Sequence, residues 1–290
     1  MFARFMDVLN EKGIREAARY AHALGHKGVE LFFPCHDGAA IPASDERKKY
    51  KAALVGEGLN VSCVSCYANL VSESCHDKAD EGTLSALFEC VDLAADVGSP
   101  YLHHTLYCNM NDELEYDAIL SFIIEGARSV ADYARGRGIT VLFEPQGFYF
   151  NGIEGFGKFY SQLKELCTNV GVCLDVGNPL WVDEEPYEFT KRYINDIKHV
   201  HLKDYVMTPF DQDSRHHTRG GKAIVECEIG AGVIDIARIL RMLDDADYSG
   251  YLSFEDNSEG DLDARTARTI TLINNTSGKL KHDIYGCNNK

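Results

Sequence analysis

Helix-like and strand-like segments alternate along almost the whole chain. Segments with apolar residues at helical spacing, such as "IREAARYAHALG" and "GVIDIARILRML", are each followed or preceded by a short apolar segment such as "KGVELFFP" or "YLSFEDN". Seven strands follow this pattern clearly, and "FARFMD" at residues 2–7 is expected to supply the first of eight. Because strands that alternate with helices form parallel sheets, eight such units in 290 residues predict an α/β fold, a closed (β/α)8 barrel.

An open, doubly wound sheet is the alternative architecture, but no GxGxxG motif follows the first expected strand. No segment rich in serine, proline or like charges divides the chain. We therefore expect one domain over residues 1–290, with a polar insertion at about residues 206–228 on the face of the barrel that carries the chemistry.

The charge and the cysteine content limit the binding partners and the cellular compartment that we expect. The chain has 45 acidic and 29 basic residues, so phosphate-rich nucleic acid is not an expected partner. Its longest apolar runs have the length of strands, which predicts no membrane partner and a cytoplasmic location. Ten cysteines without a secretory signal indicate reduced thiols. Cys63 and Cys66 should point to opposite faces of a strand, which favours buried thiols over a zinc or redox pair.

Four consecutive strand ends carry a residue that binds hard metal ions: Glu144, Asp175, His201 and Glu255. In a barrel of this kind the carboxyl ends of the strands meet at one face, where the chemistry takes place. Each carboxylate alone could be a helix N-cap. Three carboxylates and one imidazole together suit an octahedral divalent cation such as Mn²⁺, with Mg²⁺ or Co²⁺ as variants, and leave two positions for substrate oxygens or water. This pattern favours a catalytic site over a structural zinc site.

The segment "IKHVHLKD" shows how the strand that carries His201 is built. Because strand side chains alternate, His199, His201 and Lys203 share one face. His199 lies deeper and is expected to support the site rather than to bind metal. Lys203 is expected to contact substrate or to pair with a carboxylate.

Five segments resemble the sugar phosphate isomerase/epimerase family with a xylose isomerase-like TIM barrel, which includes ketose 3-epimerases and inosose isomerases. They are "LFEPQG", "CLDVGNP", "HVHLKD", "EIGAGVIDIARIL" and "YSGYLSFED". The resemblance implies that one metal ion binds Glu144, Asp175, His201 and Glu255, and that Glu144 and Glu255 are also the catalytic acid and base. It implies a structural role for the "EIGAGVID" turn.

One position departs from the family pattern. Asn178 stands where ketose 3-epimerases typically carry a histidine that touches the substrate. An asparagine can hydrogen-bond a hydroxyl group but cannot shuttle a proton, so the ketose 3-epimerase activity itself is not carried over.

Substrate contacts are expected from several further residues. His103 and His104 are adjacent, so only one of them can face the interior, and we take His104 as the substrate contact beside Asn178 and Lys203. In the insertion, His217 and Arg219 are expected to contact substrate, together with Arg215 and His216, unless the loop is merely solvated. Trp181 could stack on a sugar ring or pack between helices.

The resemblance implies a divalent-metal-dependent isomerase or epimerase of a sugar, sugar phosphate or cyclitol, acting by proton transfer through a metal-stabilised enediolate. The partner is then a small carbohydrate, and the chain could form a homo-oligomer. The alternative is a metal-dependent lyase of the same fold, such as the barrel subunit of a C-glycoside deglycosidase that acts on 3-keto glycosides with a partner subunit. A DNA-repair endonuclease and a non-catalytic sugar-binding barrel are also open, and the acidic charge disfavours the former.

Overall fold

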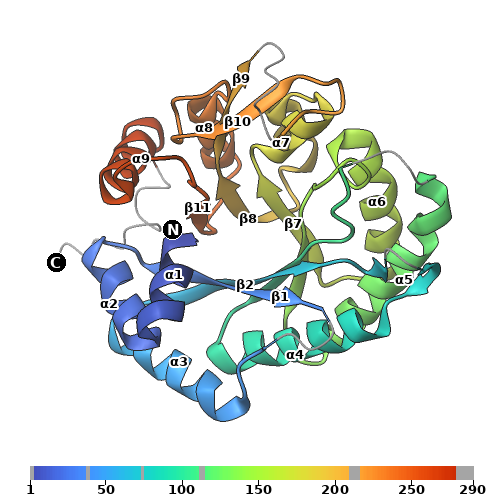
Figure 1. Ribbon diagram of the computed structural model, residues 1–290, viewed down its shortest axis with the longest axis horizontal. Helices are drawn as coiled ribbons and strands as arrows, with labels where there is room; N and C mark the ends of the chain where they lie inside the picture. The colour runs from blue at the N-terminus through green and yellow to red at the C-terminus, as the bar shows by residue number, and fades with distance from the viewer. Residues whose placement is uncertain (1–2, 37–39, 73–74, 111–114, 209–215, 279–290) are drawn as a thin grey trace.

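A curved sheet of seven parallel strands forms the centre of the molecule in the part of the chain that the structure describes. The structure is a computed structural model that describes residues 3–36, 40–72, 75–110, 115–208 and 216–278. Figure 1 shows the sheet surrounded by helices. The order of its strands is β1-β2-β5-β6-β7-β8-β11. The strands are β1 (Gly28–Cys35), β2 (Asn60–Ala68), β5 (Tyr101–His104), β6 (Thr140–Phe143), β7 (Val170–Asp175), β8 (Ile197–Leu202) and β11 (Leu252–Phe254). The predicted barrel architecture is confirmed.

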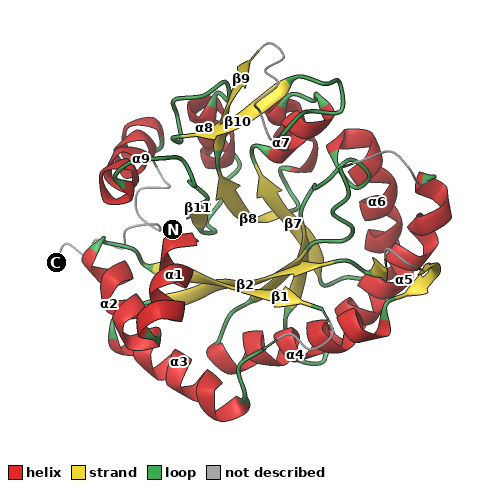
Figure 2. Cartoon of the chain, in the orientation of Figure 1, coloured by secondary structure: helices red, strands yellow, loops and turns green. Residues whose placement is uncertain are grey.

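Helices follow the strands and cover the outside of the sheet, as the colouring in Figure 2 makes clear. Their order agrees with the alternation expected from the sequence. They are α1 (Ala3–Lys12), α2 (Ile14–Ala23), α3 (Ser44–Gly56), α4 (Glu81–Val97), α5 (Tyr116–Arg135), η1 (Gly152–Phe156), α6 (Gly157–Leu166), η2 (Asn178–Val182), α7 (Pro186–Tyr193), α8 (Ile236–Asp245) and α9 (Leu262–Thr276).

The first strand expected at residues 2–7 is wrong, because the chain forms helix α1 there from Ala3 onward. Phe5, Val8 and Leu9 are buried, and their spacing of three and one residues is that of one helix face rather than of a strand. Helix α1 packs against β1. Among the described residues, the barrel sheet therefore has seven strands, one fewer than the eight expected.

The barrel closes between β1 and β11 through side chains. No backbone pairing joins these two strands in the described ranges. Ser253 of β11 donates a hydrogen bond to the Glu30 carboxylate of β1. At the start of β2, Asn60 Nδ2 donates to the Tyr251 hydroxyl at 3.0 Å. A Cβ atom on Gly28 would lie 2.6 Å from the Tyr251 ring, so glycine permits this close approach.

Two antiparallel hairpins lie outside the barrel sheet and were not expected from the sequence. They are β3 (Val71–Ser72) with β4 (Cys75–Ala79), and β9 (Asp204–Thr208) with β10 (Ala223–Cys227). The two strands of the second hairpin lie at the two ends of the expected insertion at residues 206–228. Arg215 of that insertion lies outside the described residues. The single-domain organisation stays a prediction.

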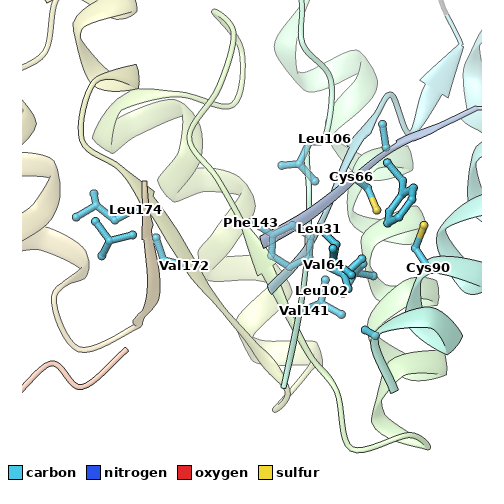
Figure 3. Packing of buried hydrophobic residues seen from close by; sticks show 14 of the residues in the cluster. Leu31, Val64, Cys66, Cys90, Leu102, Leu106, Val141, Phe143, Val172 and Leu174 are labelled. Carbon is cyan, nitrogen blue, oxygen red and sulfur yellow. The ribbon is translucent and has the colours of Figure 1, made fainter. Parts of the chain in front are cut away.

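The core between sheet and helices is formed by apolar residues and cysteines (Figure 3). Cys66 belongs to this outer core, whereas Cys63 packs inside the barrel with Leu142 and Cys173. The prediction that Cys63 and Cys66 point to opposite faces is confirmed. Among the described residues, no helix has the length and apolar character needed to cross a bilayer. The cytoplasmic location stays a prediction.

Candidate active site

Four polar side chains meet at the carboxyl ends of four strands. Glu144 directly follows β6, Asp175 ends β7, His201 lies in β8, and Glu255 directly follows β11. His201 Nδ1 lies 3.4 Å from Glu144 Oε1 and 3.2 Å from Glu255 Oε1. Ligand atoms of Glu144, Asp175 and His201 all lie within 4.8 Å of one another. The strand-end spacing thus brings together the residues expected from the sequence.

Lys203 supplies a positive charge between two of these carboxylates. Its Nζ lies 2.7 Å from Asp175 Oδ2 and 2.5 Å from Glu255 Oε2. The side chain passes close to Gly177, where a Cβ atom would lie 2.5 Å from Lys203 Cγ. The absence of a side chain at Gly177 therefore lets Lys203 reach the cluster.

Asp175 is held by the turn that follows β7. Its Oδ1 accepts hydrogen bonds from the backbone N–H groups of Gly177 at 2.7 Å and Asn178 at 2.9 Å. Burial and the charges of Glu144 and Glu255 hold the pKa of Asp175 well above its usual range, although Lys203 opposes them. Burial therefore disfavours the charged form of Asp175 among these carboxylates, and the oxygen and imidazole donors of the cluster fit a hard divalent cation.

Glu144 is oriented by two polar side chains. Asn178 Nδ2 donates to Glu144 Oε1 at 3.1 Å, and His103 Nε2 lies 3.2 Å from Glu144 Oε2. The other ring nitrogen of His103, Nδ1, lies 3.1 Å from the Ser65 hydroxyl. His103 thus belongs to the site, although it was not chosen from the sequence.

His104 points away from the carboxylates, and its choice as the interior histidine is corrected. Its ring lies edge-on to Phe143 at 5.0 Å, and Nδ1 bonds the Thr105 carbonyl at 2.8 Å. Burial lowers the pKa of His104 to about 4. The reason is strand register: His104 pairs with the outward-facing Cys66 of β2, and neighbours in register share a face.

Glu30 of β1 is a buried carboxylate that the sequence reasoning missed. Its Oε1 lies 2.9 Å from His201 Nε2, and its Oε2 lies 2.9 Å from His199 Nε2. Ser65 and Ser253 also donate to it. Burial alone would raise the pKa of Glu30, but His201 and His199 hold it well below its usual range.

An ionised Glu30 can only accept hydrogen bonds, so both Nε2 atoms must donate to it. The Nδ1 atom of His201 is then the one that faces Glu144 and Glu255. The sequence did hold a signal: Glu30 is the one charged residue within the apolar segment "GVELFF".

Residues of the expected insertion hold neighbouring loops together. Arg219 donates through its backbone to the Trp181 carbonyl at 2.8 Å and through its guanidinium to the Phe148 carbonyl. It also lines a cleft of about 320 Å³ with Phe148 and Glu184. His217 forms a β-bridge with Ala223. The loops after β6, β7 and β8 therefore meet on the face that carries the carboxylates.

The family model described as "Xylose isomerase-like TIM barrel" matches residues 18–275. Among curated proteins, an inosose dehydratase from Clostridium perfringens is 28% identical over 137 residues, which cover 46% of each chain. An inosose dehydratase from Clostridium botulinum is 32% identical over 89 residues, 30% of each chain. The aligned regions thus span at most about half the length of these relatives.

Solved structures share the fold over most of both chains. A xylose isomerase domain protein from Planctomyces limnophilus aligns with a TM-score of 0.69, 15% identity and 93% coverage of each chain. The 3-keto-D-glucoside 4-epimerase from E. coli aligns with a TM-score of 0.68, 17% identity, and coverage of 90% of this chain and 94% of that one. A Mycobacterium smegmatis protein of this fold, solved in complex with magnesium, aligns with a TM-score of 0.68, 18% identity, and coverage of 92% and 89%.

Proposed function

Because the chain belongs to the xylose isomerase-like TIM barrel family, we propose that it is a divalent-metal-dependent enzyme. Its reaction would be proton transfer at a carbon next to the carbonyl of a sugar or cyclitol. The observation that carries the proposal is the approach of two glutamates, Glu144 from β6 and Glu255 from β11, to the same nitrogen of His201. One carboxylate that removes a proton and another that returns it are what this reaction requires.

Glu144, Asp175, His201 and Glu255 would hold the metal ion, with Mn²⁺, Mg²⁺ or Co²⁺ as candidates. When bound there, a divalent cation polarises the substrate carbonyl and makes the neighbouring C–H more acidic. The approach of these carboxylates and the His201 imidazole to one another supports this assignment.

The chain's own residues position the proton transfer. Asn178 and His103 hold the Glu144 carboxylate in one orientation. A base in a fixed orientation favours proton transfer from one direction. Lys203 holds Glu255 and can stabilise negative charge that develops on a substrate oxygen. We transfer the expected histidine contact to substrate from His104 to His103.

Return of the proton to the same carbon gives an epimerase, and return to the adjacent carbon gives an isomerase. This pair of outcomes is the first candidate, because two glutamates at one site can act as base and acid. A dehydratase is the second candidate, and the curated relatives named inosose dehydratase favour it. In that reaction the ammonium of Lys203 would protonate the departing hydroxyl group.

The test is deuterium incorporation from D₂O into a panel of ketoses, inososes and 3-keto glycosides, catalysed by the Mn²⁺-loaded protein. Deuterium in recovered substrate or in an isomer supports the epimerase or isomerase. A product that has lost one water molecule supports the dehydratase. Glu255→Gln should lose either signal. Full activity of a chelated, metal-free preparation would overturn the proposal.

A further inference from the structure

Three cysteines from three separate elements meet between the sheet and helix α4. Cys35 ends β1, Cys66 lies on β2, and Cys90 lies in α4. The sulfur atoms of Cys35 and Cys90 are 3.3 Å apart, and all three sulfurs lie within 4.8 Å of one another. Each residue is at most 2% exposed. Figure 3 shows Cys66 and Cys90 among the buried side chains of the outer core.

This cysteine cluster, Cys35, Cys66 and Cys90, is separate from the carboxylate site. Cys66 faces the outer layer of the barrel, whereas the interior face of the same strand carries Ser65, which contacts Glu30 and His103. Cys63, the CxxC neighbour of Cys66, lies on the opposite face of the strand, as the alternation of strand side chains predicted. The partners of Cys66 are instead Cys35 and Cys90, which lie far from it in the sequence.

The spacing of the sulfurs matches three-coordinate thiolate binding. Three thiolates around one cation at about 2.3 Å place their sulfurs about 4 Å apart. In the cluster the separations run from 3.3 Å up to at most 4.8 Å, so small side-chain rotations suffice. Among the described residues, no histidine, aspartate, glutamate or further cysteine joins these three sulfurs as a fourth ligand, which does not match the tetrahedral site of structural zinc.

We propose that Cys35, Cys66 and Cys90 form a binding site for a soft, thiophilic cation of the Cu(I) class. Thiolates select such ions over the hard divalent cations that suit the carboxylate site. Burial holds the pKa of the Cys66 thiol well above its usual range, whereas hydrogen bonds with Cys66 and Cys90 lower the pKa of Cys35 to about 5. Binding would therefore release the proton that Cys66 otherwise retains.

The surroundings of the cluster also supply positive charge. Arg47, which is 7% exposed, lies close enough for its charge to act on Cys90. Its guanidinium is held by Glu89 at 3.1 Å and Asp96 at 3.3 Å, both on α4 with Cys90. A cluster of thiolates and a monovalent cation would carry net negative charge, and the Arg47 guanidinium, which is already paired with two carboxylates, would offset only part of it.

The test is an anaerobic titration of the reduced, metal-free protein with Cu(I) in competition with a chromophoric Cu(I) chelator. The wild type should retain a single equivalent. Cys66→Ser and Cys35→Ser should bind at least about tenfold more weakly. Cys173→Ser is the matched control. Cys173 is also a buried strand cysteine, and it forms a separate group of possible ligands with His103 and His201. The control variant should bind like the wild type.

X-ray absorption of the Cu(I)-loaded wild type provides a readout that does not depend on the variants' folding. Three sulfur neighbours around the ion support the proposal. It is overturned if the wild type releases all Cu(I) to the chelator, if nitrogen neighbours replace sulfur, or if Cys173→Ser alone abolishes retention. No substrate or divalent metal enters the experiment, so its result is independent of the proposed enzymatic function.

Discussion

Two fully buried aspartates lie at the carboxyl ends of the neighbouring strands β7 and β8, yet they have opposite surroundings. Asp204, just after β8, accepts hydrogen bonds from four backbone N–H groups. Its Oδ2 accepts from Gly230 at 3.0 Å and Gly232 at 2.9 Å, and its Oδ1 accepts from Tyr205 at 2.9 Å and Ile234 at 3.2 Å. Fixed donors thus satisfy both oxygens, and the carboxylate organises the turn before α8.

Asp175 uses only one oxygen in this way. Its second oxygen faces the Lys203 ammonium, with the charges of Glu144 and Glu255 close by. The comparison separates two uses of the same side chain. A carboxylate saturated by backbone donors stabilises the fold, whereas a carboxylate that faces ionisable side chains remains available for a cation or a proton.

The largest expected effect is the loss of stability in Asp204→Ala. Four buried N–H groups would lose their acceptor, and we expect a fall of about 3–4 kcal/mol in the free energy of unfolding. Urea unfolding measures it. Asp235→Ala is the control, since the Asp235 side chain caps α8 through a single bond to the Arg238 N–H at 2.9 Å and should cost about 1 kcal/mol. Equal losses in both variants would break the comparison.

Glu255→Gln tests the carboxylates that face ionisable side chains. We expect at least about a 100-fold loss of deuterium exchange, because an amide cannot remove or return a proton. The free energy of unfolding should change by less than about 1 kcal/mol. Glu259→Gln, an exposed position in the same segment, should retain full exchange. If Glu255→Gln keeps its exchange rate, this residue is not the acid or base.

Glu30→Gln should weaken divalent-metal binding by about tenfold. A glutamine presents one acceptor oxygen and an NH₂ donor, so it cannot accept from both His199 and His201. Calorimetric titration with Mn²⁺ measures the change. Ser253→Ala removes a hydrogen bond to Glu30 but leaves both histidine contacts, so its affinity should stay close to that of the wild type. Equal affinities of wild type and Glu30→Gln would contradict the role assigned to Glu30.

Asp175→Asn should give the smallest change in stability. Removal of a charge that burial and neighbouring carboxylates already disfavour should leave the metal-free protein within about 1 kcal/mol of wild type, or slightly more stable. The free energy of unfolding in the presence of a chelator is the measurement. A loss as large as that of Asp204→Ala would show that Asp175 is structural too.

The sequence predicted the barrel and the convergence of Glu144, Asp175, His201 and Glu255, because both follow from chain order and strand direction. It failed where three-dimensional register decides. The choice between His103 and His104 depends on which of them is level with Ser65 of a neighbouring strand, and no local pattern encodes this.

Two other features were not predicted from the sequence, for different reasons. Glu30 stands within an apolar strand, and its histidine partners lie in β8, far away along the chain. The strand expected at residues 2–7 rested on apolar content, over a segment too short to show helical spacing. The spacing of Phe5, Val8 and Leu9 becomes a clear helical pattern only when it is followed to Lys12.

Glu30 has a second structural role, because it contacts β11 across the seam between β1 and β11. Strands that lack a backbone partner on one side normally invite pairing with foreign chains and open most readily to solvent. Here a single carboxylate ties this seam to the imidazoles of the active site, since Glu30 bonds Ser253 across the seam and His201 within the barrel. We therefore expect opening of this seam to displace the His201 imidazole as well, and amide hydrogen exchange along β11 would report such opening.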